Sequence, residues 1–304
     1  MLAMWISLSA FAAGNVDRVP LDYPTIQDAV KRGSAPLIEV APGRWAGATV
    51  TRPVKIRGLP GAVIASGPRY AGLNIGFALA SASTGTEIAG FRFACESPLL
   101  DVGVYSSARR FGTAAAQVSV RDNTFNGCVQ GVTVAGSATD ECLPERLDGG
   151  QLWTIEGNTF DGFSTKADNG AEGGGIGVFA FNSREIDVVD NRFVGVVADK
   201  RAFTTGGVVV AGCWDCTIAA NAFRVDGAKA YWAAISNLGF YQTGAASSRD
   251  LLIVDNDAHA DAAPNLDVNF RSYDSYRTTF DGNAGVVFVD HTTCGDDALD
   301  TFER

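Results

Sequence analysis

A segment that recurs about every 32 residues places the strongest limit on what this chain can fold into. In each copy two apolar residues lie two positions apart and are followed by the triplet Asn, any residue, Phe. The clear copies cover 118–125, 153–160, 186–193 and 216–223. Weaker copies end at Asn256 and Asn283, and upstream copies around Leu59 and Phe91 keep the register without the Asn. Such self-similarity is typical of stacked repeat proteins.

Each repeat is predicted to consist of short strands and turns, because apolar residues two apart are a strand signal and no helical stripe separates them. A second short strand follows in several repeats, at Val132 and Val134, Ile176 and Val178, Val208 and Val210, Leu266 and Val268. The pattern predicts a β-solenoid, in which about eight coils stacked ~4.8 Å apart form a rod of roughly 40 Å. Leucine-rich repeats are excluded because their Leu pattern is absent, and a propeller blade needs about 40–45 residues.

The Asn that closes each repeat is expected to lie inside a corner of its coil. Asn tolerates left-handed backbone, and its amide can bond the N–H and C=O groups of a turn. Stacked coils would align six of these residues in one internal ladder: Asn123, Asn158, Asn191, Asn221, Asn256 and Asn283. Four rings are expected to stack beside the ladder in the core: Phe125, Phe160, Phe193 and Phe223. We therefore interpret these asparagines as structural residues rather than as a site.

The N-terminal part departs from the repeat. Thr25 and Asp28 form a capping-box-like pair, which predicts a short helix over the residues that follow. Residues 37–40 predict a strand and residues 41–43 a turn. A helix at this position would cap the open end of the solenoid, whose free strand edge otherwise invites pairing with other chains.

Composition excludes several other classes of protein. Apolar residues make up 46% of the chain, enough for a large core, and 35 glycines exclude helix bundles and coiled coils. The net charge of −10 argues against nucleic acid as a partner, because phosphate binding requires a basic surface. With only two histidines, His259 and His291, a three-His metal site is impossible.

Residues 1–13 are expected to form a secretory signal segment, followed by a single domain over 14–304. The apolar run 2–13 ends in small residues, as a signal does, and is too short for a membrane span of ~20 residues. No Lys or Arg precedes it, so a genuine N-terminal strand is the alternative. No other stretch predicts a membrane span, and we expect a secreted or periplasmic protein.

The six cysteines of an exported chain favour disulfides over metal or redox chemistry. Cys95 and Cys128 follow register positions 91 and 123 by 4 and 5 residues, so they occupy nearly the same place on consecutive coils. We predict a Cys95–Cys128 disulfide, the alternative being two unpaired thiols in the core. Cys213 and Cys216 predict a local disulfide or two separate bridges.

Several segments together resemble the pectin lyase-like superfamily of right-handed parallel β-helices. They are DYPTIQDAV, IEVAPGRWAGATVTRPVKIRG and the recurring DNTFNG, GNTFDG and DNRFVG, and the opening segment is similar to that of pectinesterases. The resemblance covers about residues 20–290 and implies a right-handed parallel β-helix. The superfamily contains polysaccharide lyases, glycoside hydrolases, esterases, epimerases and non-catalytic adhesin-like proteins. The hydrolase motifs Gly-His-Gly and Arg-Ile-Lys, the pectinesterase motifs and the epimerase motif Asp-Pro-His-Asp are all absent, so only lyase-type sites stay open among the enzymes.

Long inserts on a rigid scaffold are where function concentrates. Here they run over 137–151, 164–175, 197–207, 225–233 and 258–265. Three of the chain's five lysines fall in successive inserts, 8, 9 and 8 residues after the register Asn, and the candidate catalytic residues are Lys166, Lys200, Arg201 and Lys229. A uronic-acid lyase needs a cation to neutralise the substrate carboxylate and a base to remove the neighbouring proton. Ordinary mixed charge on solvent-facing turns is the alternative.

Acids and rings accompany these cations. The acids that could bind calcium through hard oxygen ligands are Asp168, Glu172, Asp199 and Asp226. The rings that could stack on sugars, or alternatively pack the inserts onto the rod, are Phe203, Tyr231 and Trp232. A second, weaker cluster contains Asp101, Tyr105 and Arg109, of which the first two share a strand face.

Two functions remain open from the sequence. The first is an exported carbohydrate-active β-helix, best described as a lyase acting on an acidic, uronic-acid polysaccharide with calcium as cofactor. The second is a non-catalytic surface β-helix that binds carbohydrate or acts as an adhesin. The sequence leaves the choice of polysaccharide, the catalytic status and the oligomeric state open.

Overall fold

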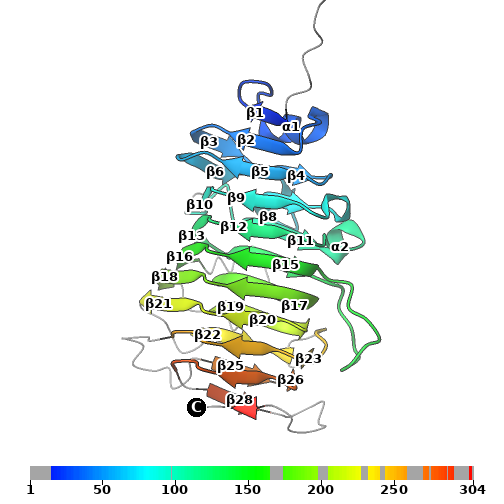
Figure 1. Ribbon diagram of the computed structural model, residues 1–304, viewed down its shortest axis with the longest axis vertical. Coiled ribbons are helices and arrows are strands. Elements are labelled where there is room, and N and C mark those ends of the chain that lie inside the picture. The colour runs from blue at the N-terminus through cyan, green and yellow to red at the C-terminus, as the bar shows by residue number, and fades with distance from the viewer. Residues whose placement is uncertain are drawn as a thin grey trace, which may run out of the picture.

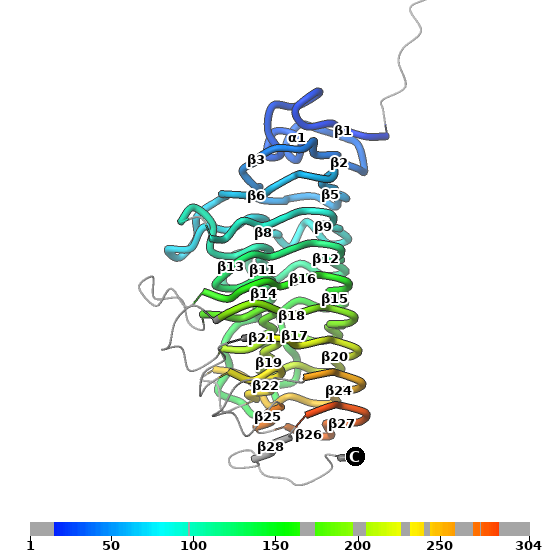
Figure 2. Tube along the Cα trace, turned by 90° about the vertical axis from the view of Figure 1, so that its left-hand side faces the viewer, coloured from blue at the N-terminus to red at the C-terminus, as the bar shows by residue number. Residues whose placement is uncertain are grey.

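The computed structural model of the protein is a rod built almost entirely of parallel strands (Figure 1). The chain colours run in order down the long axis, so successive coils stack in sequence order, and Figure 2 shows the same stacking from the side. This arrangement confirms the predicted β-solenoid. The structure describes residues 15–96, 98–164, 174–197, 205–226, 232–239, 244–258, 270–273, 275–285, 287–290 and 301–302.

Three rows of strands, here called sheets 1, 2 and 3, form the walls of the rod. Sheet 1 stacks β1 (Val16–Val19), β2 (Leu37–Val40), β5 (Lys55–Gly58), β9 (Glu87–Ala89), β12 (Ser119–Arg121), β15 (Gln151–Glu156), β20 (Thr217–Ala219), β24 (Leu252–Val254), β27 (Thr279–Asp281) and β29 (Thr301–Phe302). Sheet 2 stacks β3 (Gly43–Ala46), β6 (Ala62–Ser66), β10 (Arg92–Ala94), β13 (Thr124–Cys128), β16 (Thr159–Phe163), β18 (Arg192–Val197) and β21 (Ala222–Asp226).

Sheet 3 closes the coil on its remaining side. It stacks β4 (Ala48–Val50), β8 (Leu73–Leu79), β11 (Val102–Ser107), β14 (Gln130–Ala135), β17 (Ile176–Val189), β19 (Thr205–Trp214), β22 (Trp232–Asn237), β25 (Phe270–Tyr273) and β28 (Val287–Asp290). Strand β17 also belongs to sheet 1, because its first half pairs with β14 and its second half with β15. The strands predicted around Val132, Ile176 and Val208 are therefore β14, β17 and β19, whereas Leu266 and Val268 lie outside the described residues.

In addition to α1 (Ile26–Arg32), five short elements belong to the described part of the rod. Strand β7 (Arg69–Tyr70) pairs antiparallel with β8, and β23 (Ser248–Arg249) and β26 (Ser275–Tyr276) extend the corner after sheet 3. A 3-10 helix (Ser81–Ser83) follows β8, and the one-turn helix α2 (Ala108–Phe111) follows β11. Both helices lie where the chain leaves sheet 3.

The predicted internal Asn ladder is confirmed at the corner between sheets 1 and 2. Each of the first five register asparagines is 1–2% exposed. The Nδ2 of Asn158 donates to Oδ1 of Asn191 at 3.0 Å, and the same bond links every neighbouring pair from Asn123 to Asn283. The backbone N–H of each residue donates to the same oxygen of the next, so from Asn158 to Asn283 each amide oxygen of the ladder accepts two hydrogen bonds.

The left-handed residue of each corner is not the Asn itself, as the sequence suggested, but the residue before it. Asp122, Asp190, Ala220 and Asp255 all have φ of 53–55°, and Gly157 takes the same place with φ of 64°. This turn swings the following Asn inward, where its amide reaches the next coil. Asp is one of the side chains that tolerate this conformation, while Ala at position 220 adopts it at a cost.

A stack of phenylalanine rings runs beside the ladder. Phe125, Phe160, Phe193 and Phe223 stack as predicted, with centroids 4.6–4.8 Å apart and planes within 8° of parallel, and Phe93 extends the stack by one ring. The rings press on glycines of sheet 3. A Cβ on Gly131 would lie 2.5 Å from Cε1 of Phe160, so this position of the sheet excludes every other residue.

Two disulfides join described cysteines. Cys95 and Cys128, on consecutive coils, are bonded with Cα atoms 4.7 Å apart, which confirms the predicted pairing. Cys213 and Cys216 form the local disulfide that was one of two alternatives. Strand stacking brings the first pair together, because the register of β10 and β13 pairs Phe93 with Phe125.

The predicted helix is α1 (Ile26–Arg32), which packs on β1, β2 and β4 at the N-terminal end of the rod (Figure 1). Thr25 is its N-cap: Oγ1 accepts from the backbone N–H of Asp28 at 3.0 Å and donates to Oδ2 of Asp28 at 2.7 Å. Ile26 and Val30 face the core, where both are at most 1% exposed. The capping pair seen in the sequence therefore starts this helix.

Candidate functional site on the outer face of sheet 3

The outer face of sheet 3 carries two clusters of side chains that are separate from the core of the rod. Along β19, Val208 and Val210 belong to the core, whereas Val209 and Ala211 belong to an outer cluster. This is the alternation expected of a strand with two covered faces. We call the outer group near β11 the Tyr105 cluster (Tyr70, Tyr105, Arg109, Arg110 and Phe111) and the group near β17 and β19 the Phe181 cluster (Phe179, Phe181, Val209, Leu238 and Ala245).

The Tyr105 cluster is assembled from both edges of sheet 3. Tyr70 lies on β7, on the edge where the chain enters the sheet, and Arg110 and Phe111 lie on α2, on the edge where it leaves. The guanidinium carbon of Arg110 stands 4.7 Å from the ring centroid of Tyr70 and 4.9 Å from that of Phe111. The rings of Tyr70 and Tyr105 are 5.8 Å apart. The result is one cation held between aromatic rings.

A buried hydroxyl fixes the insert that carries α2. Ser106 Oγ donates to the carbonyl of Leu79 at 2.9 Å and accepts from the N–H of Ala115 at 2.8 Å. Gly112, with φ of 82°, ends the helix in the left-handed conformation that glycine adopts most easily. The chain therefore leaves β11, makes one helical turn over the outer face and returns, which places Arg110 above Tyr70.

Burial controls the charges of this cluster. Burial raises the pKa of Tyr105, and the hydrogen bond from Ser107 opposes this only partly. Burial also lowers the pKa of Arg110, against the attraction of the nearby phenols of Tyr105 and Tyr70. Tyr105 is therefore a neutral phenol at neutral pH, whereas arginine stays charged.

The cations of the cluster have no acid beside them. Among the described residues neither Arg109 nor Arg110 makes an ion pair, and the buried Nη1 of Arg110 has no hydrogen-bond partner. Asp101, expected to accompany Tyr105, is instead 2% exposed and accepts from the N–H and Nδ2 of Asn74 at 2.8 and 3.0 Å. Its carboxylate serves to join two coils.

The Phe181 cluster is covered by two segments that Asn182 ties together. Asn182 is 1% exposed, with φ of 45°, and its Nδ2 donates to the carbonyls of Ser137 and Gly244 at 2.6 and 2.9 Å. Its Oδ1 accepts from the N–H of Ala246 at 2.8 Å. Insert 136–150 and segment 244–247 are thus held over the ring of Phe181. Asn182 was not predicted from the sequence because it lies outside the register; its only signal was the run Phe-Asn-Ser, which breaks the apolar alternation.

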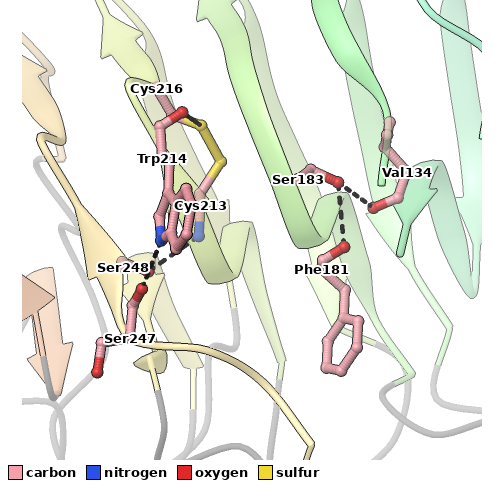
Figure 3. Close-up of a disulfide and its surroundings, with 8 residues drawn as sticks. All are labelled: Val134, Phe181, Ser183, Cys213, Trp214, Cys216, Ser247 and Ser248. Carbon is pink, nitrogen blue, oxygen red and sulfur yellow. Dashed lines mark hydrogen bonds between the residues drawn. A yellow bond between two sulfur atoms is a disulfide. The ribbon is translucent and has the colours of Figure 1, made fainter. Parts of the chain in front are cut away.

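The corner after sheet 3 is braced by the Cys213–Cys216 disulfide (Figure 3). Trp214 Nε1 donates to the carbonyl of Ser247 at 2.9 Å, and the N–H of Cys213 donates to Ser248 Oγ at 3.2 Å. On the preceding coil Ser183 Oγ bonds the carbonyls of Val134 and Phe181. Both cysteines are at most 1% exposed, so this disulfide is structural.

The three lysine-bearing inserts open side by side. Phe163 pairs with Val197, and Val196 with Asp226, so the strands before the inserts end on consecutive coils of sheet 2. After the inserts the chain continues in register too, as Ile176 pairs with Gly206 and Gly206 with Ala233. The following predicted residues lie outside the described residues: Lys166, Asp168, Glu172, Asp199, Lys200, Arg201, Phe203, Lys229 and Tyr231. Of Asp226 only the backbone, at the end of β21, is described.

Trp232 is not the exposed sugar platform that the sequence allowed. It is the first residue of β22, is 4% exposed, and its ring lies 4.9 Å from that of Phe163 within the core. The alternation of β22 turns this side chain inward, where burial of a large ring stabilises the coil. Packing, the alternative weighed for these rings, describes Trp232.

Within the described part of the chain, no group of three or more His, Cys, Asp or Glu is close enough to hold a metal ion. None of its helices has the length and apolar character needed to cross a membrane.

Comparison with known proteins shows the fold. No family model matches the chain, and no curated protein matches it. Alginate lyase from Paenibacillus sp. str. FPU-7 has a similar structure, with a TM-score of 0.58 and 16% identity over 91% of each chain. The Streptococcus pneumoniae surface protein and adhesin PfbA gives 0.48 and 11%, over 87% of this chain and 91% of that one. The catalytic domain of GH87 α-1,3-glucanase gives 0.44 and 10%, over 97% and 69%.

At these identities the likeness concerns architecture alone. The long parallel sheets and the overlay with the alginate lyase define a mostly β, solenoid class of protein. The same fold hosts different functions, so function has to be argued from the site.

Proposed function

We propose that the protein is an exported carbohydrate-active β-helix that acts on an acidic, uronic-acid polysaccharide as a lyase. The observation that carries this proposal is the alignment of the three inserts, whose flanking strands pair in register on consecutive coils. Segments that leave and re-join adjacent coils in register emerge within about 10 Å of one another. Such an edge would gather the scarce basic side chains of a chain whose net charge is −10.

The chemistry we propose is β-elimination. A cation from Lys166, Lys200, Arg201 or Lys229 neutralises the uronate carboxylate, and a second of these groups, unprotonated, takes the proton from the adjacent carbon. The electron pair forms a C=C bond while the glycosidic C–O bond breaks, and the leaving oxygen takes a proton. Phe203 and Tyr231 would contact the sugar. Calcium at Asp168, Glu172, Asp199 and Asp226 would bridge the acidic polymer to the acidic protein, because its ligands are hard oxygens.

Architecture and compartment form part of the same proposal. The protein whose structure is similar at a TM-score of 0.58 is named an alginate lyase, which favours an acidic polysaccharide for this fold. The two disulfides between described cysteines favour an oxidising, extracellular or periplasmic location. We further propose membership of the pectin lyase-like superfamily, a right-handed helix of about eight coils, α1 as its N-terminal cap, and a 1–13 signal followed by one domain.

A non-catalytic polysaccharide-binding protein is the second candidate. The Tyr105 cluster favours it, because aromatic rings around an arginine that makes no ion pair among the described residues offer contacts to an acidic sugar without supplying a base. In that case the described part of the outer face would bind a polymer without cleaving it.

The test of the lyase function is ultraviolet absorbance of the unsaturated product on a panel of polyuronates, with and without a calcium chelator. Lys200→Ala should lower the rate by about 100-fold. Lys31→Ala, at an exposed position of α1, is the matched control and should leave the rate unchanged. If no polyuronate yields product while gels containing the same polymers retard the protein, the binding function replaces the lyase; if neither occurs, both are wrong.

A further inference from the structure

We propose that Arg110, with Tyr105 and Tyr70, forms a carboxylate-binding subsite for one acidic sugar unit at the N-terminal part of the outer face of sheet 3. The inference rests on the proposed function for its substrate class, but its residues are separate from the three inserts. The geometry on which it stands belongs wholly to described residues.

Arg110 carries a hydrogen-bond donor that the described protein groups do not use. Arg110 Nη1 is buried, and among the described residues it has no acceptor. A guanidinium loses hydration when it is buried, and leaving a donor unpaired costs free energy that an acceptor from outside would recover. An oxygen of a bound carboxylate is the acceptor that matches the planar fork of arginine.

The described surroundings of Arg110 contain no acid. The groups acting on its charge are the phenols of Tyr105 and Tyr70. Among the described residues neither Arg109 nor Arg110 makes an ion pair, so the protein itself does not neutralise their charge. Arg109 beside Arg110 adds positive charge to the same place. An anion is therefore the complementary ligand.

Aromatic rings line the space around the guanidinium. The rings of Tyr70 and Phe111 lie against it, and the ring of Tyr105 lies beside that of Tyr70, tilted at 46°. Aromatic faces provide apolar contact for the C–H face of a sugar, while a phenol offers an O–H to one of its oxygens. Because burial holds the pKa of Tyr105 above its ordinary value, its O–H remains a donor throughout the physiological range.

The Tyr105 cluster lies close to the lysine-bearing inserts along the rod. Strand β11 of the cluster pairs with β14, and β14 pairs with β17, the strand that follows the first lysine-bearing insert. Two strand spacings separate them, about 10 Å along the rod. One polysaccharide lying along sheet 3 would span this distance, so the Tyr105 cluster would hold a unit beside those at the inserts rather than the unit that reacts.

The experiment is isothermal titration of the full chain with trigalacturonate and with its carboxyl-reduced counterpart, which differs only in its charged groups. Wild-type protein should bind the acidic trisaccharide, and Arg110→Gln should weaken that binding about 10-fold, as loss of a charged hydrogen bond predicts. Arg110→Lys should fall between the two, because it keeps the charge and loses the fork. Arg57→Gln, an exposed arginine on the outer face of sheet 1, is the matched control and should bind as wild type does.

Each result decides the proposal. Equal affinity of wild type and Arg110→Gln for trigalacturonate, or no binding by wild type, overturns the subsite, while the absorbance assay on polymers judges the lyase function by itself. Binding that depends on Arg110 without any polymer cleavage or retardation keeps the subsite and overturns the lyase and binding functions. Should Arg110→Gln melt below the control, Tyr105→Phe serves instead, and about threefold weaker binding is expected for loss of one neutral hydrogen bond.

Discussion

The corner between sheets 1 and 2 and the edges of sheet 3 follow opposite rules. At the Asn corner the spacing from Asn to Phe is two residues in four successive coils, and every amide bonds the next coil. At the edges of sheet 3 the connections differ from coil to coil: one contains α2, and another is the long insert 136–150. Hydrogen bonding between adjacent coils prevents changes in residue type and spacing at the Asn corner. A segment that leaves the stacked coils can change in both length and side-chain chemistry.

An insertion tests this contrast most strongly. One Gly added after Asn158 would move Phe160 to the opposite face and break the Phe stack beside the ladder, which should cost about 5 kcal/mol or more and prevent folding. The same Gly added after exposed Glu145, in the insert 136–150, should change stability by less than about 0.5 kcal/mol, because loop length has a weak effect. Soluble yield and thermal melting measure both, and similar losses at the two positions would contradict the comparison.

Phe160→Ala probes the stacked core beside the ladder. Phe160 is 1% exposed and lies between Phe125 and Phe193, with Gly131 against its edge, so no neighbouring side chain can fill the space. We expect about 4 kcal/mol of destabilisation, as for large cavities in rigid cores. Denaturant unfolding measures it. Phe179→Ala, a half-buried ring on the outer face, is the control and should cost clearly less.

Asn191→Ala removes one rung of the ladder. It leaves the backbone N–H of Asn158 without its acceptor and the carbonyl of Ile155 without this donor, while the Nδ2 of Asn158 keeps its bonds to the carbonyls of Val120 and Glu156. Buried groups left unpaired predict a loss of about 3 kcal/mol. Asn126→Ala is the control. Asn126 lies on β13 of sheet 2, outside the ladder, and its buried Oδ1 has no partner among the described residues. A loss of stability as large for Asn126→Ala would show that ladder bonding is not the cause.

Tyr105→Phe gives the smallest effect and reports on the outer face. Because burial holds the folded pKa of Tyr105 above the unfolded value near 10, the unfolded chain loses this proton first as pH rises. The contribution of the neutral phenol is present below pH 10 and is lost as pH rises through the folded pKa. Wild type should therefore lose more stability than Tyr105→Phe between pH 9 and 11, by up to about 1 kcal/mol. Parallel curves would place Tyr105 in solvent.

The periodic sequence made the core predictable, but it carried no information on the contacts at the outer face of sheet 3. The Asn ladder, the Phe stack and Cys95–Cys128 follow from positions that repeat, because stacked coils convert sequence spacing into contact. The glycines that face the Phe stack escaped detection, since Gly131 precedes its ring by 29 residues and Gly177 precedes its own by 16. The insert 136–150 lies between Gly131 and Phe160, whereas β17 (Ile176–Val189) runs on toward Phe193 without an insert, so the two spacings differ and the period is lost.

The candidate site was predictable only in pieces. Tyr105 and Arg109 were singled out, but Tyr70 comes from another coil and Arg110 reaches the cluster only through the helical turn of α2. Trp232 was wrongly assigned to the exposed sugar-binding rings because it follows a long insert. After such an insert the alternation along the strand does not show whether the first side chain faces the core or the solvent. Sequence spacing fixes contacts inside the repeat, while contacts between inserts depend on three-dimensional placement.

The ladder also has a direction. Each of the five bonds between ladder amides runs from the Nδ2 of one Asn to the Oδ1 of the Asn on its C-terminal side, while the same Nδ2 groups also donate to carbonyls of the preceding coil, as Asn158 does to Val120. Six amides are thus connected head to tail inside the rod, where each bond polarises the next. The row of amides is therefore asymmetric along the axis: at its first rung the Asn123 oxygen accepts from the N–H of Phe91, and at its last rung the Asn283 NH2 donates back to the carbonyl of Ile253. Both terminal amides are thus satisfied by backbone groups, and a further rung inserted in the row would have to hold its amide in this same direction.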